Sequence, residues 1–464
     1  MTMLSTDEPS SSKLDTGFET TGIERVEEHE RAHTQLLDTM WLWWSANSVV
    51  ATVAVGALSF YFGLGFWGSI GIIVLFNVLG ALPVAFLSTL GPKTGLAQMP
   101  LSRFAFGIQG AKLPALFNAI ACIGWSAVNA LIGASLLESW SGGKISKVVA
   151  LLILAVLTTI VSVFGYFIVH RYERIAWIPM FLLFGYVFYA ASPHFNTNIP
   201  SSVTGLALFS SIMTFGGIVF GFAVGWTSYA ADYTRRQPHS TPAGKVFTYA
   251  LLGVTLPCII LEVLGVLLAS TLGPKDSLPD AGTLISHNIG GGILASIVVL
   301  LLAFSTIANN VPNDYSFALS LQVLGVNIPR WILTLVGAVA YILIALLIAQ
   351  GFNANLEGFL LLIAYWLGGY AAISFIEDRL RKGSYPVADY TDASKMPPGI
   401  AAVASMVIGL IAAAFGINQA ATINFEGPLS KALADADIGF PLAIIVTGIV
   451  YYFLRKWEMS RTGR

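Results

Sequence analysis

The residues with the clearest chemical potential are carboxamides inside an apolar stretch. Residues 291–324 are mostly apolar but include Asn309, Asn310, Pro312, Asn313 and Asp314. In hydrocarbon, amides and carboxylates persist where they face protein, water or a ligand, because an unpaired one is costly. Residues four apart share one side of a helix, so Asn309 and Asn313 would form an amide ledge. Pro312 would free a backbone carbonyl about one turn earlier. We interpret this ledge as a ligand site.

Two other stretches could add flat aromatic rings to that site. Trp125 and Asn129 are four residues apart in one apolar run, and Phe222 and Trp226 lie in another. Aromatic faces stack on planar rings, while amides pair with ring edges. The combination favours a planar heterocycle as ligand. The alternative is that each aromatic packs in the core or against lipid, and that each Asn forms a structural hydrogen bond between helices.

Several carboxyl groups lie inside apolar runs or at their ends. Glu262 is central in one run, and Asp314 follows the amides. A carboxyl in apolar surroundings readily takes up a proton, so both are candidate proton carriers. Asp232 and Pro312 are candidate gate residues. Glu377, which is followed closely by basic residues, is expected to form a solvated ion pair at the inner surface.

Composition indicates an integral membrane protein. The 464 residues are 56% hydrophobic and 11% charged, and the mean hydropathy is +0.75. The net charge of −1 argues against nucleic acid as a partner. The six histidines lack ligand spacing, and no nucleophile elbow or nucleotide-binding fingerprint is found, so we expect neither a metal site nor an enzyme. Cys122 and Cys258 lie in apolar runs and are expected to be reduced. Residues 1–38 are polar, which is unlike a signal peptide.

Twelve apolar spans can be counted along the chain. They cover residues 40–63, 67–90, 112–138, 147–168, 174–191, 204–230, 246–272, 291–323, 330–350, 355–377, 399–417 and 437–455. With both termini in the cytoplasm, twenty of the 24 Lys and Arg residues fall on the inner side, as the positive-inside rule requires. The loop 91–107 is too rich in Gly and Pro for a regular helix and is expected to shape an inner gate. Residues 23–31 could form a short interfacial helix.

The first and sixth spans share small and hydroxyl residues that interrupt an apolar run. Span 1 contains Ser45 and Ser48, and span 6 contains Gly225. Five helices separate the two spans, so the second copy would be inverted in the membrane. Broken helices at corresponding positions of two inverted halves indicate the central site of a transporter. The alternative is that Gly and Ser only allow close helix packing.

The chain resembles the nucleobase:cation symporter-1 family, in particular its purine–cytosine permease branch. The resemblance rests on residues 22–24, 44–47, 91–103, 124–129, 230–233 and 308–313, the last with the motif Asn-Asn-x-Pro-Asn. It implies an all-α membrane protein of twelve transmembrane helices, a five-plus-five inverted repeat (LeuT-type) with two additional C-terminal helices. It also implies uptake of cytosine and of purines such as adenine, guanine and hypoxanthine.

The resemblance also suggests residue roles and boundaries. The substrate would contact Trp125 and Asn129 of helix 3, Trp226 or Phe222 of helix 6, Asn309, Asn310 and Asn313 of helix 8, and Ser45 or Ser48 of helix 1. The expected organisation is a largely flexible cytoplasmic tail (1–38), a transporter core (39–378), a cytoplasmic linker (379–398), helices 11 and 12 (399–455) and a cytoplasmic tail (456–464).

One departure from the family bears on the coupling ion. Sodium-coupled relatives carry helix-8 hydroxyls just before the first Asn, where this chain has Ile307 and Ala308; Ser305 and Thr306 are two residues earlier. Since a sodium site needs several converging oxygens, we predict proton coupling, with sodium as the alternative.

The sequence therefore predicts a proton-driven nucleobase importer without a cofactor, in the cell membrane, as a monomer or weak homo-oligomer. Alternatives are transport of another nitrogen heterocycle (allantoin, uracil, hydantoin, thiamine or pyridoxine), a channel, or a receptor.

Overall fold

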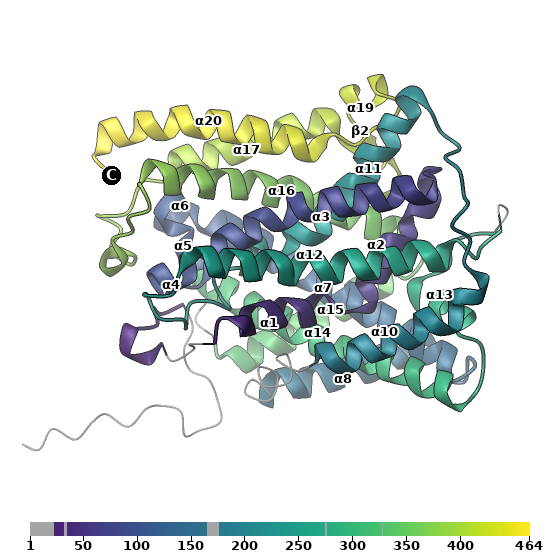
Figure 1. Ribbon diagram of the computed structural model, residues 1–464. Coiled ribbons are helices and arrows are strands. Elements are labelled where there is room, and N and C mark those ends of the chain that lie inside the picture. Colours follow the sequence, from purple (N-terminus) through teal and green to yellow (C-terminus); the bar gives the residue numbers. More distant parts are fainter. Residues whose placement is uncertain (1–22, 32–34, 165–175, 274–275, 327) are drawn as a thin grey trace, which may run out of the picture.

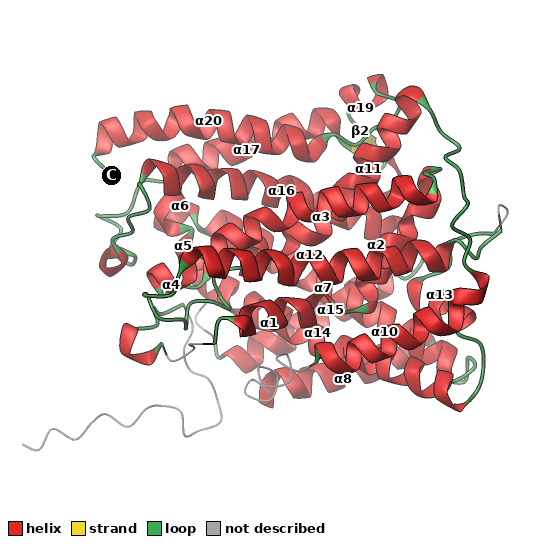
Figure 2. Cartoon of the chain, viewed as in Figure 1, coloured by secondary structure: helices red, strands yellow, loops and turns green. Residues whose placement is uncertain are grey.

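The computed structural model describes residues 23–464 except 32–34, 165–175, 274–275 and 327. These residues form a helical bundle, and the described strands are a single two-residue pair, β1 (Asn418–Gln419) and β2 (Phe425–Glu426) (Figure 2). The long helices run side by side, with α17 and α20 along one edge and α8 and α10 along the opposite edge (Figure 1). The C-terminus and the short helices α4 to α6 lie at the same end of the bundle.

Each predicted span contains a helix. The helices are α1 (Leu37–Asn47) with α2 (Val50–Ala57), α3 (Phe66–Ser88), α7 (Lys112–Trp140), α8 (Lys147–Phe164), α10 (Trp177–Ala191), α11 (Gly205–Val224), α12 (Ala243–Ala269), α14 (Ile293–Leu324), α15 (Arg330–Ile348), α16 (Phe352–Leu380), α17 (Ile400–Gly416) and α20 (Gly439–Thr462). Among the described residues, eight helices are long and apolar enough to cross a bilayer, or nine if the bent pair at the start counts as one span. The count of twelve therefore stays a prediction.

The interruption predicted in span 1 is present, whereas span 6 is not broken and only tightens at its end. Between α1 and α2 the backbone leaves the helical region at Ser48 (ψ 65°) and Val49 (φ −135°, ψ 159°), and the axis bends by 61°. The α2 end continues as a 3-10 helix, η2 (Leu58–Phe62). At its own end α11 tightens into the 3-10 helix η4 (Gly225–Tyr229). Unwound and tightened turns leave backbone groups for partners outside the helix.

The amide-bearing helix α14 is held against α7 by a close approach. It starts after Gly292 (φ 116°) and stops before Gly325 (φ 96°), conformations that suit glycine. Pro312 lies inside α14 without ending it. A Cβ atom on Gly133 of α7 would come within 2.5 Å of the Thr306 hydroxyl. The missing side chain at Gly133 thus lets α7 and α14 place their amides side by side.

The loop 91–107 forms no long regular helix, as expected, and one expectation about residues 23–31 needs correction. The loop contains short helical pieces, α4 (Leu90–Thr94), α5 (Gln98–Leu101) and α6 (Arg103–Gly110). Gly95 and Gly107, both at positive φ, separate these turns into short pieces. Residues 23–31 contain only the 3-10 turn η1 (Glu28–Glu30), and Arg31 donates to the Pro92 carbonyl at 2.8 Å. This segment packs on the loop and is not an interfacial helix.

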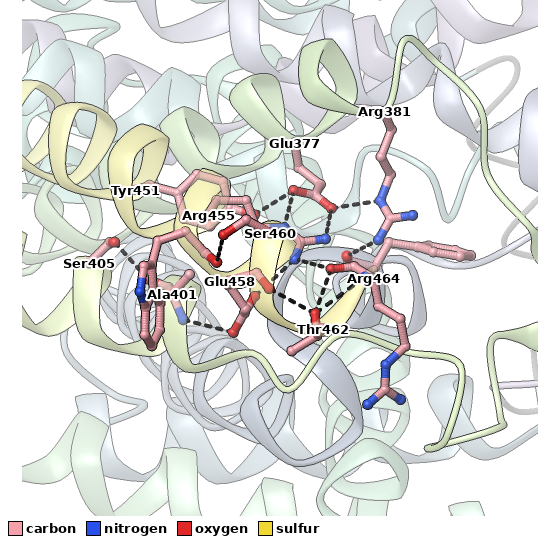
Figure 3. Close-up of polar contacts among 12 residues, drawn as sticks. Glu377, Arg381, Ala401, Ser405, Tyr451, Arg455, Glu458, Ser460, Thr462 and Arg464 are labelled. Atoms are coloured by element: carbon pink, nitrogen blue, oxygen red, sulfur yellow. Dashed lines mark hydrogen bonds and ion pairs between the residues drawn. The ribbon is translucent and has the colours of Figure 1, made fainter.

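The solvated pair expected at Glu377 is also wrong. Glu377 is 2% exposed, and both of its carboxylate oxygens accept 2.9 Å bonds from the guanidinium of Arg455 (Figure 3). Tyr451 and Arg381 donate further bonds of 2.6 Å each. Arg455 also donates to Glu458 at 2.9 Å. Because Arg455 comes from α20, 78 residues later, local sequence spacing could not reveal a cluster that ties α16 to α20.

Candidate ligand-binding site

A cavity lies where the α1–α2 break, α7, the end of α11 and α14 meet. It contains about 360 Å³ of space not filled by atoms, part of which is open to solvent. Its lining consists of Ala46, Val49, Ala51, Trp125, Asn129, Phe222, Gly225, Trp226, Tyr229, Asn309 and Asn313. The structure thus brings together, on four elements, most of the substrate-contact residues that the sequence singled out.

Aromatic rings form the walls of the cavity. Trp125 of α7 meets Phe222 of α11 edge to face, with ring centroids 5.5 Å apart and planes at 84°. A Cβ atom on Gly225 would come within 3.3 Å of the Trp125 ring, so this glycine lets η4 pass close to the indole. Trp226 donates from Nε1 to Asn47 Oδ1 at 2.8 Å. Asn47 is the last residue of α1, so the helix break itself fixes the Trp226 ring.

Asn129 and Asn310 form a bridge between α7 and α14. Asn129 Nδ2 donates to Asn310 Oδ1 at 3.0 Å, and Asn310 Nδ2 donates to the Ser126 carbonyl at 3.3 Å. Asn310 is 1% exposed and does not line the cavity. Its position matches the structural hydrogen bond weighed as the alternative. The bridge leaves the Asn129 carbonyl oxygen as an acceptor for a ligand.

Asn313 is oriented by a residue that the sequence analysis did not single out. The Tyr229 hydroxyl lies 3.1 Å from Asn313 Oδ1, to which it donates, and 3.1 Å from the Cys122 sulfur. With its oxygen engaged and one N–H donated to the Asn309 backbone carbonyl at 3.5 Å, Asn313 offers its second amide N–H as a donor. Asn309 Oδ1, in contrast, is a buried acceptor with no partner among the described residues. The cavity therefore presents acceptors at Asn129 and Asn309 and a donor at Asn313.

Ser45 and Ser48 are not among the cavity residues. The Ser45 hydroxyl accepts the backbone N–H of Trp177 at 3.0 Å, and the Ser48 hydroxyl donates to the Trp44 carbonyl at 2.8 Å. The Ser48 hydroxyl thus serves the backbone of its own helix, as is common for Ser near a helix end, whereas the Ser45 hydroxyl joins α1 to the start of α10. Span 1 meets the cavity instead through Ala46, Val49 and Ala51, which flank the break.

The candidate proton carriers lie outside the cavity lining and have different surroundings. Glu262 of α12 is 0% exposed and accepts a 2.6 Å bond from Asn77 of α3. Asp314 of α14 is 6% exposed and accepts a 2.5 Å bond from Ser162 of α8. Glu262 Oε1 has no partner among the described residues. The two carboxyls thus belong to separate regions of the bundle.

The two gate candidates occupy separate sites. Asp232 follows η4 and accepts the backbone N–H of Gln98, at the start of α5, at 2.6 Å. Burial raises the pKa of Asp232 to about 6, opposed by the Gln98 bond and by the positive charge of Arg235. Asp232 thereby links the end of span 6 to the loop 91–107. Pro312 is buried within α14 beside the amide residues.

Tyr229, Asn47 and Asn77 are the polar residues that sequence reasoning missed. Asn77 stands alone in an apolar span, and the rule applied to Asn309 would have flagged it. Asn47 belongs to a stretch already identified as a helix break. Tyr229 carries no such signal, because it reaches the cavity only through the tightened turn η4.

Comparisons with known proteins agree with this architecture. A family model described as permease for cytosine/purines, uracil, thiamine, allantoin matches residues 25–435. The chain is 37% identical to the purine-cytosine permease fcyB of Emericella nidulans, over 96% of this chain and 90% of that protein. It is 36% identical to the purine-cytosine permease FCY2 of Saccharomyces cerevisiae, over 96% and 87%.

Among solved structures, the chain is similar to Mhp1, a nucleobase-cation-symport-1 family transporter in a closed conformation with bromovinylhydantoin bound. The TM-score is 0.75 at 16% identity, covering 95% of this chain and 96% of that chain. That likeness shows the fold, an inverted-repeat transporter bundle, and the family match extends over most of the chain. The protein is thus a multi-pass membrane permease and belongs to the family of permeases for cytosine/purines, uracil, thiamine and allantoin.

Proposed function

We propose that this protein imports cytosine and purines such as adenine, guanine and hypoxanthine by alternating access, with protons as the coupling ion. The observation that carries the proposal is the cavity at the α1–α2 break, walled by Trp125 and Phe222 and lined by Asn309 and Asn313. Stacking on π-faces and pairing with amides are the two interactions that a flat, polar-edged ring needs. The relatives named as purine-cytosine permeases support the same substrate class.

The polarity of the amides supports a substrate with an amino group beside a ring nitrogen. Asn129 and Asn309 offer acceptors, whereas Asn313 offers a donor. Cytosine and adenine each present an exocyclic N–H donor next to a ring-nitrogen acceptor, and an Asn amide can pair with both. Uracil presents an oxygen where cytosine has its amino group. We therefore expect cytosine to bind in preference to uracil.

The residues just before Asn309 support protons over sodium. Ile307 and Ala308 carry no side-chain oxygen there, and Ser305 and Thr306 are two residues earlier on α14. A sodium site needs several converging oxygens, so two missing oxygens would weaken it. The Lys and Arg distribution supports cytoplasmic termini in a cell membrane. We propose a monomer or weak homo-oligomer as the working unit.

Uptake of labelled cytosine by cells that express the chain tests the proposal. The wild type should show saturable uptake that unlabelled adenine and hypoxanthine suppress. Asn313→Ala should abolish uptake, because it removes the donor that Tyr229 holds in place, while the amount of protein in the membrane stays normal. Asn198→Ala, in an exposed loop, is the matched control. Unchanged uptake kinetics in Asn313→Ala would contradict the site assignment.

The coupling ion is tested in the same cells. Uptake should collapse on addition of a protonophore and persist when sodium is replaced by choline. A strict sodium requirement would overturn the proton assignment but leave the substrate assignment intact. Counterflow of labelled base in exchange for unlabelled base distinguishes a transporter from a channel or receptor.

A further inference from the structure

A carboxyl and an amide face each other inside the bundle, away from the cavity. Glu262 of α12 and Asn77 of α3 are both 0% exposed. Asn77 Nδ2 donates to Glu262 Oε2 at 2.6 Å. The other oxygen of each group, Glu262 Oε1 and Asn77 Oδ1, is buried and has no partner among the described residues. Both unpartnered atoms thus belong to the same pair of side chains.

A proton on Glu262 would satisfy both unpartnered oxygens. An ionised carboxylate and an amide oxygen only accept hydrogen bonds, so an ionised Glu262 would leave two buried acceptors without a donor. Each buried acceptor without a donor lowers the stability of the fold. A proton on Glu262 turns the carboxyl into a donor to Asn77 Oδ1 while it still accepts from Asn77 Nδ2. The two side chains then form a two-bond acid–amide pair with no unpartnered atom.

The surroundings of Glu262 provide no compensating charge. The neighbouring helices α2, α3 and α11 contain no ionisable residue. On α12 itself, Cys258 lies one turn earlier. The same helix also carries Lys245 and Tyr249, more than three turns earlier, and the other neighbouring elements contribute Asp38, Tyr61, Tyr186, Tyr189 and His287; the hydrogen bond seen at the Glu262 carboxyl among the described residues comes from Asn77. An ion without a counter-charge in a membrane interior is costly, which again favours the neutral acid.

The helix that carries Glu262 contacts the helix break that borders the cavity. A Cβ atom on Gly56 of α2 would lie 1.8 Å from the Glu262 backbone oxygen, so α2 and α12 touch backbone to backbone there. Cys258 donates to Asn47 Oδ1 at 3.2 Å, the same oxygen that Trp226 binds. Hence α12 contacts both sides of the α1–α2 break, and one of those contacts continues to a cavity wall.

We propose that Glu262 binds the coupling proton, that Asn77 holds it in the protonated form, and that proton and nucleobase strengthen each other's binding through the α1–α2 break. The proposal rests on the proposed function, since it names the proton-binding residue of that transport. The proton enters Glu262 with the substrate and leaves to the inner side when the substrate is released. Asp314 accepts from Ser162 of α8 and is not part of this acid–amide pair.

Purified full-length protein in liposomes tests the assignment by two transport assays. With an inward proton gradient, the wild type should accumulate labelled cytosine above equilibrium; without a gradient, it should exchange cytosine by counterflow. Glu262→Gln replaces the acid with an amide that still makes two bonds to Asn77. This variant should keep counterflow within about threefold of wild type, yet fail to accumulate cytosine in response to the gradient. Glu426→Gln, the same change in strand β2, is the control.

Cytosine binding to detergent-solubilised protein gives a readout that does not need transport. If proton and cytosine bind cooperatively, wild-type affinity is highest at low pH and falls by up to about tenfold per pH unit as Glu262 loses its proton. In Glu262→Gln the affinity should not change with pH. This binding measurement tests the role of Glu262 even if the variant has lost counterflow.

Different results would refute the role of Glu262 and the proposed function. Gradient-driven accumulation by Glu262→Gln, or pH-dependent cytosine binding equal to that of wild type, would overturn the role of Glu262. Loss of coupling in Asp314→Asn with normal coupling in Glu262→Gln would also overturn it. Failure of the wild type to take up cytosine, or accumulation driven by sodium alone, would instead refute the proposed function, before any variant is compared.

Discussion

Two buried glutamates in this protein have opposite surroundings. Glu377, where α16 meets α20, receives bonds from two arginines and a tyrosine, so both of its oxygens are satisfied (Figure 3). Glu262 has one neutral donor, from Asn77, and one oxygen with no partner among the described residues. The donors around Glu377 stabilise its charged form. Both oxygens of Glu262, in contrast, have hydrogen-bond partners only when the group carries a proton. Two similarly buried glutamates therefore have different partners: Glu377 joins two helices through its ion pairs, and we propose that Glu262 changes its protonation state.

The Glu377 cluster should show the largest response to a single change. Arg455→Met leaves the buried Glu377 carboxylate with fewer donors, and losing one partner of a buried ion pair costs about 3–5 kcal/mol. We expect a clear fall in the thermal unfolding midpoint of the detergent-solubilised protein. Lys456→Met, at the next and exposed position on α20, should leave the midpoint unchanged.

A double variant refines that result. Glu377→Gln combined with Arg455→Met removes both charges, so part of the lost stability should return. A midpoint for Arg455→Met equal to that of Lys456→Met would show that the cluster does not hold α16 to α20. Glu377 would then no longer be an example of a buried glutamate whose ion pairs hold helices together.

Breaking the Glu262 pair should have a smaller effect. Asn77→Leu removes the amide from a neutral acid, and an unpartnered neutral group costs about 1–3 kcal/mol. The midpoint should fall by less than in Arg455→Met. Replacing both residues, as Asn77→Leu with Glu262→Leu, should recover most of the loss. A fall as large as that of Arg455→Met would indicate that Glu262 carries a charge in the resting protein.

The smallest effect is expected from removing an uncharged hydrogen bond at the cavity. Tyr229→Phe keeps the ring but removes the hydroxyl that orients Asn313. A hydrogen bond of this kind contributes about 1 kcal/mol, so cytosine should bind roughly five- to tenfold more weakly with normal stability. Tyr189→Phe, at an exposed position on α10, is the control. Unaltered affinity in Tyr229→Phe would mean that Asn313 is oriented without the hydroxyl.

The sequence predicted the parts of the site that follow helical periodicity. Trp125 with Asn129, and Asn309 with Asn313, are pairs four residues apart, and both pairs line the cavity. The break in span 1 was also recognisable, because small and hydroxyl residues interrupt the apolar run there; the same signal in span 6 predicted a break where the helix only tightens. These signals depend on one helix at a time, which is why a single sequence reveals them.

Contacts between distant helices could not be predicted in this way. Asn310 bonds to Asn129 instead of lining the cavity, although it neighbours Asn309. Arg455 reaches Glu377 from another helix, and Ser45 bonds to the backbone of Trp177. Which polar groups pair with each other is set by how the helices pack. The sequence identifies polar residues in apolar spans, but only packing decides which of them stay available to a ligand.

The central claim is that the cavity at the α1–α2 break binds nucleobases through its amide ledge. Equilibrium binding of labelled cytosine to purified wild type and Asn313→Ala protein, with unlabelled adenine as competitor, tests it most directly. We predict saturable binding to one site in the wild type, displacement by adenine, and loss of binding in Asn313→Ala. Wild-type protein that binds neither cytosine nor adenine would contradict this claim. So would an Asn313→Ala variant that binds cytosine as tightly as the wild type.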